Sequence, residues 1–149
     1  MDQQNFSHSH QLAVNAYLMN RNKFLLLKRR EAPCIWAPPG GRLNVDEDPL
    51  KGLRREVREE TRLEIKIICP ANTWFGRWKN SWLLSIDYLV KWKSGTVLLS
   101  DEHSDYYWVS LEELERGEPV QLNPDTGFQF EDFKYAFRLY NLLKNSGIK

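Results

Sequence analysis

Short apolar runs separated by polar breaks dominate the chain, a pattern typical of a sheet with few helices. The polar breaks at 20–22 and 79–81 carry Asn, Lys and Ser, which favour turns. Residues 11–28 are therefore expected to form a hairpin. Strands are predicted at 11–19, 23–28, 63–69, 73–77, 82–92 and 106–109. Residues 31–47, which include three prolines and two glycines, are expected to form a long loop.

Helical patterns interrupt these strands at three places. Asp48 suits the cap and Pro49 the first position of a helix over 49–61, with Leu50, Leu53 and Val57 as its core-facing stripe. A short helix is expected after Ser110, and an amphipathic helix over 128–144. This order predicts an α/β protein with a mixed sheet and helices on both faces.

Length and composition indicate one globular domain. The chain has 149 residues, of which 42% are hydrophobic and 28% charged. We expect a flexible N-terminal segment at 1–10, including His8 and His10, and a single domain at 11–149. The two cysteines, Cys34 and Cys69, match no metal or redox motif.

The charge balance and the apolar runs exclude some functions. With 21 basic and 20 acidic residues the net charge is +1, which argues against bulk electrostatic binding to nucleic acid. The N-terminus lacks the apolar core of a signal peptide, and no run approaches the roughly 20 apolar residues of a membrane helix. A cytoplasmic protein without membrane contact is therefore expected.

The candidate chemistry lies in the helix over 49–61 and the loop before it. Glu56, Glu59 and Glu60 are at i, i+3 and i+4, on one face of the helix. Such carboxylates repel one another, and a divalent cation with oxygen ligands, Mg²⁺ or Mn²⁺, would relieve the repulsion. Arg55 is expected to pair with Glu47 and so hold the loop on the helix.

A helix rich in Glu and Arg is more often only a solvated surface. The complete string changes this balance: Gly41, five residues, Glu47, seven residues, then REVREE at 55–60 and Leu63. It resembles the Nudix hydrolase box at every fixed position except one, where Arg62 replaces a glycine. WAPPGG at 36–41 and EHSDYYWV at 102–109 also resemble family segments.

The resemblance implies an α/β/α sandwich that hydrolyses a nucleoside diphosphate linked to another moiety, and a domain that can form a homodimer. By the same resemblance, the metal ligands would be Glu56, Glu59, Glu60 and the Gly41 carbonyl. Catalytic roles would fall to Glu56, Glu59, Glu102 and Arg55, any of the three glutamates being the general base. Candidate substrate-binding residues are Arg29, Arg42, Trp36, Gly40 and Trp74, with Lys28 and Arg30 as further cations. Arg62 would end the helix differently from the family glycine, or bear strain.

Two alternative functions are compatible with the sequence. A nucleotide sensor without catalysis could use the same fold, and a partner-binding domain could carry a merely solvated acidic helix. The aromatic residues Trp74, Phe75, Trp78 and Trp82 could stack on bases, but core packing is favoured for at least two of them. His103 is expected to be partly exposed, with a packing or hydrogen-bonding role.

Overall fold

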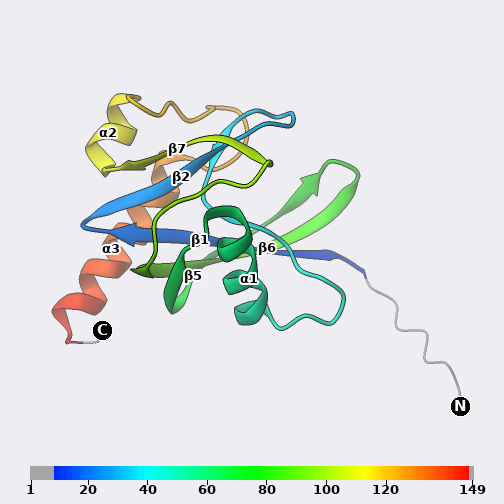
Figure 1. Cartoon of the computed structure of the whole chain (residues 1–149), viewed down its shortest axis with the longest axis horizontal. Coiled ribbons are helices and arrows are strands. Elements are labelled where there is room, and N and C mark those ends of the chain that lie inside the picture. Colours follow the sequence, from blue (N-terminus) through cyan, green and yellow to red (C-terminus); the bar gives the residue numbers. More distant parts are fainter. Residues whose placement is uncertain (1–8, 148–149) are drawn as a thin grey trace, which may run out of the picture.

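A mixed sheet forms the centre of the protein in the computed structural model, which describes residues 9–147 (Figure 1). The sheet has seven strands in the order β3-β2-β1-β6-β5, with β4 beside β1 and β7 beside β2. Among the strand pairs within residues 9–147, only β1 and β6 run parallel. The strands are β1 (Gln11–Asn20), β2 (Lys23–Arg29), β3 (Trp36–Ala37), β4 (Gly40–Arg42), β5 (Glu64–Trp78), β6 (Ser81–Ser94) and β7 (His103–Val109). The expected flexible segment 1–10 falls mainly on residues 1–8, including His8, which lie outside the described residues.

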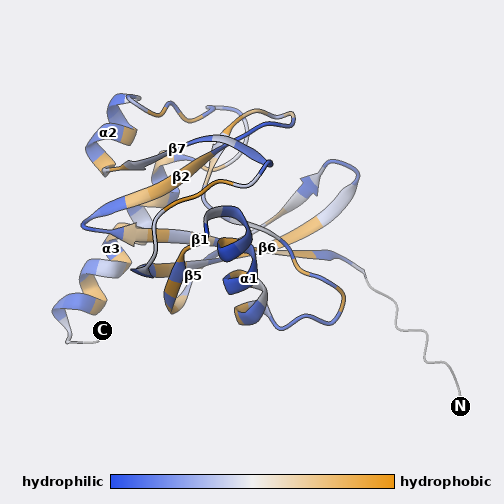
Figure 2. Ribbon diagram, in the orientation of Figure 1, coloured by the Kyte–Doolittle hydropathy of each residue, from blue (hydrophilic) through white to orange (hydrophobic). Residues whose placement is uncertain are grey.

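Helices cover both faces of the sheet, as predicted. They are α1 (Pro49–Thr61), α2 (Leu111–Arg116) and α3 (Phe130–Asn145). One core cluster joins Leu53 and Val57 of α1 to Val14 of β1. A second cluster on the opposite face joins Phe133 of α3 to Tyr17 and Phe24. Figure 2 shows β2 as largely apolar and α1 as mostly hydrophilic, since only one side of α1 contacts the sheet.

Three expectations about elements need correction. The strands predicted at 63–69 and 73–77 are one long strand, β5, whose pairing with β6 shifts register around Pro70. The predicted loop over 31–47 contains the short strands β3 and β4. Leu50 is 46% exposed and does not belong to the core stripe, because it lies in the first turn of α1, before the helix reaches the sheet.

None of the helices within residues 9–147 has the length and apolar character needed to cross a membrane.

Candidate active site

The position of helix α1 is fixed by its N-terminal cap and by two buried residues. The Asp48 carboxylate accepts the N–H groups of Leu50 and Lys51 at 3.1 and 3.0 Å, and Pro49 follows at the first helical position. Leu53 and Val57 are fully buried and fix the rotation of the helix on the sheet. Glu59 therefore lies on the exposed side of the helix, whereas Glu56, whose side chain is only 13% exposed, lies at the edge of the packed side.

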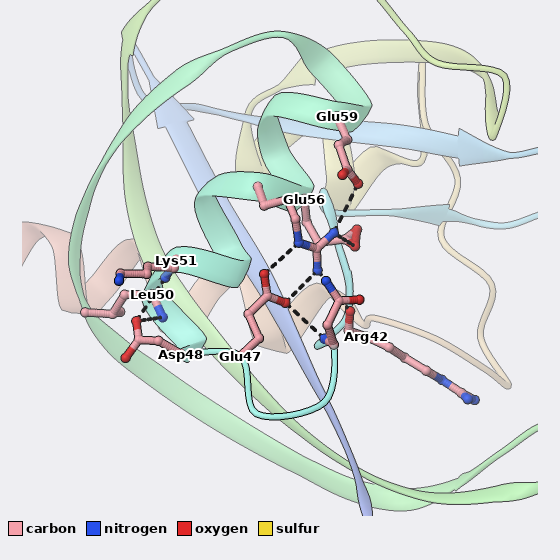
Figure 3. Close-up of polar contacts among 9 residues, drawn as sticks. Arg42, Glu47, Asp48, Leu50, Lys51, Glu56 and Glu59 are labelled. Atoms are coloured by element: carbon pink, nitrogen blue, oxygen red, sulfur yellow. Dashed lines mark hydrogen bonds and ion pairs between the residues drawn. The ribbon is translucent and has the colours of Figure 1, made fainter.

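Arg55 connects the loop to the helix. Its Nε and Nη2 donate to the two carboxylate oxygens of Glu47 at 2.7 and 2.8 Å, which confirms the predicted pair. Its Nη1 donates to Glu56 at 2.9 Å and to Glu59 at 3.1 Å. Figure 3 shows Glu47, Glu56 and Glu59 on the same side of the helix, while the side chain of Arg42 extends away from them. Hydrogen bonds from Arg55 and from the Asn44 N–H lower the pKa of Glu47 to about 2.

Glu60 is the most buried carboxylate of the site. It is 4% exposed and accepts the Gly40 N–H at 2.9 Å. Burial raises its pKa to about 9, and the charges of Glu56, Glu102 and Glu59 act in the same direction. The neutral form is therefore favoured unless a cation replaces the lost solvation.

The glycine pair lets β4 approach both β1 and α1. A Cβ on Gly40 would overlap the Val14 carbonyl and the Asn15 side chain, and one on Gly41 would overlap the Glu56 carboxylate. A side chain at Gly40 would push β4 away from β1, and one at Gly41 would displace the Glu56 carboxylate. The backbone of Gly41 therefore lies directly against Glu56.

Glu102 joins the cluster from a segment that is distant from α1 in the sequence. It precedes β7, and its charge raises the pKa of both Glu56 and Glu60 after the larger effect of burial. Glu56 and Glu60 thus lie beside the glycine pair, and Glu59 and Glu102 lie near enough for their charges to act on both. Hard oxygen donors of this kind fit Mg²⁺ or Mn²⁺. Within residues 9–147, no group of three His, Cys, Asp or Glu side chains is already arranged to hold a metal ion.

The carboxylates open into a cavity of about 790 Å³. The cavity brings together most of the predicted residues: Arg29, Gly40, Gly41, Arg42, Glu56, Glu60, Trp74 and Glu102. It does not include Glu59, Arg55 or Trp36. The ring of Trp36 lies 5.7 Å from Tyr107 and beneath Lys28 instead. Of the other two proposed cations, Arg30 lines the cavity and Lys28 does not.

The structure corrects the expectation for the aromatic residues. Trp74, Phe75 and Trp82 are 46%, 56% and 48% exposed, and Trp78 is partly exposed. None of the four packs in the core, because the β5–β6 hairpin extends beyond the helices that cover the rest of the sheet (Figure 1). Trp74 and Trp78 line the cavity.

Several polar residues of the cavity were missed by sequence reasoning. Asn15, Ser85 and Asp87 lie on its floor, and Arg77 and Lys79 add cations to its wall. The available signal was a polar residue within the apolar strands at 11–19 and 82–92. His103 was expected to be partly exposed but is 8% exposed, and its Nδ1 has no hydrogen-bond partner in the described residues. Burial and the charge of Arg29 lower the pKa of His103 to about 4.

Arg62, the departure from the family pattern, keeps the left-handed backbone that the family glycine would adopt. Its φ is 66°, and its N–H donates to the Arg58 carbonyl at the end of α1. The helix ends in the same manner as with glycine, and Arg62 bears the strain.

Comparison with known proteins identifies the family of this chain. The NUDIX domain model matches residues 9–128. A MutT-like protein from Streptomyces ambofaciens is 28% identical over 93% of this chain and 80% of its own length. The asymmetrical bis(5'-nucleosyl)-tetraphosphatase of Mus musculus is 32% identical over 61% of this chain and 66% of its own length.

A solved structure shows the same fold. The MutT protein from Methanosarcina mazei Go1 superposes with a TM-score of 0.73 and 28% identity, covering 91% of this chain and 99% of that one. The family match spans the glutamate helix, the glycine pair and the Glu102 segment. This chain belongs to the Nudix family and is a hydrolase of phosphoric anhydride bonds.

Proposed function

We propose that this chain is a divalent-metal-dependent pyrophosphohydrolase acting on a nucleoside diphosphate linked to another moiety. That class includes nucleoside triphosphates, nucleotide sugars, ADP-ribose and dinucleoside polyphosphates. The observation that carries the proposal is that Glu56, Glu60 and Glu102 line a cavity whose wall also carries Arg29, Arg30, Arg42 and Arg77. The similarity to a mouse tetraphosphatase named for a dinucleoside substrate supports a nucleotide derivative.

Glu56, Glu59 and Glu60, with the Gly41 carbonyl, are the proposed metal ligands. When bound, Mg²⁺ or Mn²⁺ would neutralise pyrophosphate charge and lower the pKa of an attacking water. Arg55 restrains Glu56 and Glu59 through bonds of 2.9 and 3.1 Å, so the two carboxylates do not have to be ordered during binding.

The arginines of the cavity wall are suited to bind phosphoryl oxygens, on which negative charge increases during the reaction. Water adds to one phosphorus as the bridging P–O bond breaks, and a carboxylate takes the water proton. We assign this last role to Glu102. Its side chain makes no hydrogen bond within residues 9–147, whereas Glu56 is held by Arg55 and Glu60 by Gly40.

The test is a phosphate-release screen over the four substrate groups with Mg²⁺ and with Mn²⁺. Turnover of at least one substrate, abolished by EDTA, is expected. Stabilisation by nucleotides without any turnover would instead support a sensor. Nucleotide and metal titrations that leave Glu56–Glu60 unperturbed would support a merely solvated helix.

Variants then separate metal ligation from proton transfer. Glu59→Gln and Glu60→Gln should weaken Mn²⁺ binding and nearly abolish turnover. Glu102→Gln should keep Mn²⁺ affinity but lower kcat by about 100-fold or more, the usual contribution of a general base. Glu115→Gln, on the exposed side of α2, is the control and should behave as wild type. Normal kcat in Glu102→Gln would move the proton acceptor to Glu56.

A further inference from the structure

Three polar side chains on β1 and β6 form a linked cluster on the cavity floor. Asn15 lies on β1, beside Asp87 of β6 in the parallel register, and Ser85 is two residues before Asp87. Asn15 Nδ2 donates to Ser85 Oγ and to Asp87 Oδ1, both at 2.9 Å. Ser85 Oγ also donates to Asp87 Oδ1, at 2.5 Å. Ser85 and Asp87 are only 4% and 2% exposed.

Burying a carboxylate in a sheet is expensive, and an apolar residue would serve the fold better. The positions that continue the same face, Tyr17 of β1 and Leu89 of β6, are indeed core residues. Burial raises the pKa of Asp87, with a further contribution from the charge of Asp132 at the start of α3. The hydrolytic chemistry proposed above uses neither Asp87 nor Asn15, so the cluster calls for a separate role.

The cluster offers acceptors to the cavity. The Asn15 amide and the Ser85 hydroxyl donate their hydrogen bonds within the cluster, to Ser85 Oγ and Asp87 Oδ1. Asp87 Oδ2 and Asp132 Oδ1 receive no hydrogen bond from residues 9–147, and both residues line the cavity. A ligand that satisfies this floor therefore presents hydrogen-bond donors to it, and neighbouring N–H groups suit a pair of carboxylates.

A flat aromatic surface lies beside these acceptors. Trp74 of β5 is paired with Ser85, and Asn72 with Asp87. A Cβ on Gly76 would lie 2.6 Å from Cζ2 and 2.8 Å from Cη2 of Trp74, so the indole ring lies across the glycine. The ring lines the cavity and the residue is 46% exposed. Indole faces of this kind stack on heterocyclic bases.

We propose that Asn15, Ser85, Asp87 and Trp74 recognise an aminopyrimidinone ring, the ring that guanine and pterins share. Its ring N–H and its exocyclic amino group are adjacent donors in one plane, which matches a floor of carboxylate acceptors. Adenine places an acceptor beside its amino group, and uracil places carbonyls on both sides of its N–H. Both would leave acceptors facing acceptors.

The ring site and the hydrolytic site belong to one cavity. Asn15 pairs with Gly40 in the register of β1 and β4, and the Gly40 N–H binds Glu60. A volume of about 790 Å³ accommodates a nucleotide. The inference rests on the proposed function to the extent that the recognised ring is carried by the anhydride substrate.

The first test needs no variant. Binding of GDP, IDP and ADP to the wild-type protein is measured by calorimetry without metal, so that it does not depend on turnover. GDP is expected to bind about 10-fold or more tightly than IDP, which lacks the amino group, and than ADP. Equal affinities, or no binding of any of the three, would overturn the recognition site.

The second test locates the preference in Asp87. Asp87→Asn should lower GTP affinity about 10-fold or more and leave ATP affinity unchanged. Asp105→Asn, on exposed β7, is the matched control and should alter neither. If Asp87→Asn does not unfold cooperatively, the comparison of GDP with IDP in the wild type still decides the matter. An unchanged GTP preference in a folded Asp87→Asn would refute the assignment.

Hydrolysis assays distinguish the two sources of the ring and the two proposals. GTP and dihydroneopterin triphosphate are compared with ITP and ATP in the presence of Mg²⁺, and the better of the first two identifies the natural ring. Guanine-selective binding without hydrolysis of any substrate would retain the ring site and refute the hydrolase proposal. Hydrolysis without selectivity for either ring would refute the ring site and retain the hydrolase proposal.

Discussion

Arg55 shows how a single side chain organises the site. A guanidinium has donors in a fixed planar arrangement, which allows one residue to bind Glu47 through two bonds and to reach Glu56 and Glu59 as well. The sequence predicted the pair with Glu47 from the place of the two residues in the loop and the helix. The bonds to Glu56 and Glu59 are local too, but which carboxylates Arg55 reaches depends on the path of the loop.

Replacing Arg55 with Lys should therefore lower kcat about 10- to 100-fold, as expected when a residue that orients metal ligands is lost. Lysine keeps the charge but cannot bind three carboxylates in fixed directions. Steady-state kinetics with the best substrate of the screen would measure the effect. The control is Arg58→Lys. Arg58 lies on the exposed side of the same helix and pairs with Glu64 of β5. Equal kinetics in the two variants would show that Arg55 contributes charge only.

Glu60 predicts how stability depends on pH in the metal-free protein. Its pKa in the folded state, about 9, lies above the value near 4.5 that it regains on unfolding. The unfolded state therefore releases the proton first, and stability falls as pH rises through the interval between these values. Urea unfolding in EDTA from pH 5 to pH 9 should show this decline. Glu60→Gln should flatten the decline, and a slope as steep as that of wild type would contradict the assignment.

At the scale of elements, local sequence determined where α1 begins and tertiary contacts determined where strands continue. Asp48 and Pro49 mark the start of α1 by themselves, because capping needs only neighbouring backbone. Strand β5 passes through Pro70, which the pattern marked as a break. The partner strand β6 accommodates this residue through register shifts, and a single strand carries no information about such a partner.

The end of α1 provides a test of backbone strain. Arg62 has a φ of 66°, and relieving it with Arg62→Gly should raise the free energy of unfolding by about 1 kcal/mol, less the entropy that glycine adds to the unfolded chain. Chemical denaturation would measure the change. Lys134→Gly, on the exposed face of α3, should instead destabilise by about 1 kcal/mol. Destabilisation by both variants would show that Arg62 is not strained.

The whole molecule creates the cavity from segments that are distant in sequence. Strand β1, the glycine pair, α1, the β5–β6 hairpin, the Glu102 segment and the start of α3 all contribute to its wall. Helix α3 closes the face that carries the polar cluster, with Phe133 packed edge-on against Tyr17 and Phe24 at centroid distances of 5.5 and 5.3 Å. Formation of the cavity thus depends on the packing of α3.

Phe133→Ala should accordingly destabilise the protein by about 3–5 kcal/mol, the usual loss for a fully buried aromatic residue. Nucleotide affinity should fall with it, since Asp132 precedes Phe133 and lines the cavity. Tyr135→Ala, at a residue that is 50% exposed on the same helix, should change stability by less than about 1 kcal/mol. Thermal unfolding with and without GDP would measure both effects, and equal losses in the two variants would contradict this role of Phe133.

The sequence by itself determined the local features of this protein: the cap of α1, the core positions Leu53 and Val57, the glycine pair and the spacing of the glutamates. Each depends on neighbours along one helix or loop, where periodicity fixes which side chains share a face. Only the tertiary structure decided that Asn15, Ser85 and Asp87 share a floor, that Glu102 joins Glu56 and Glu60, and that Trp74 is exposed beside them while Trp36 lies elsewhere. These relations depend on strand order and register, which are set by packing between segments far apart in the chain.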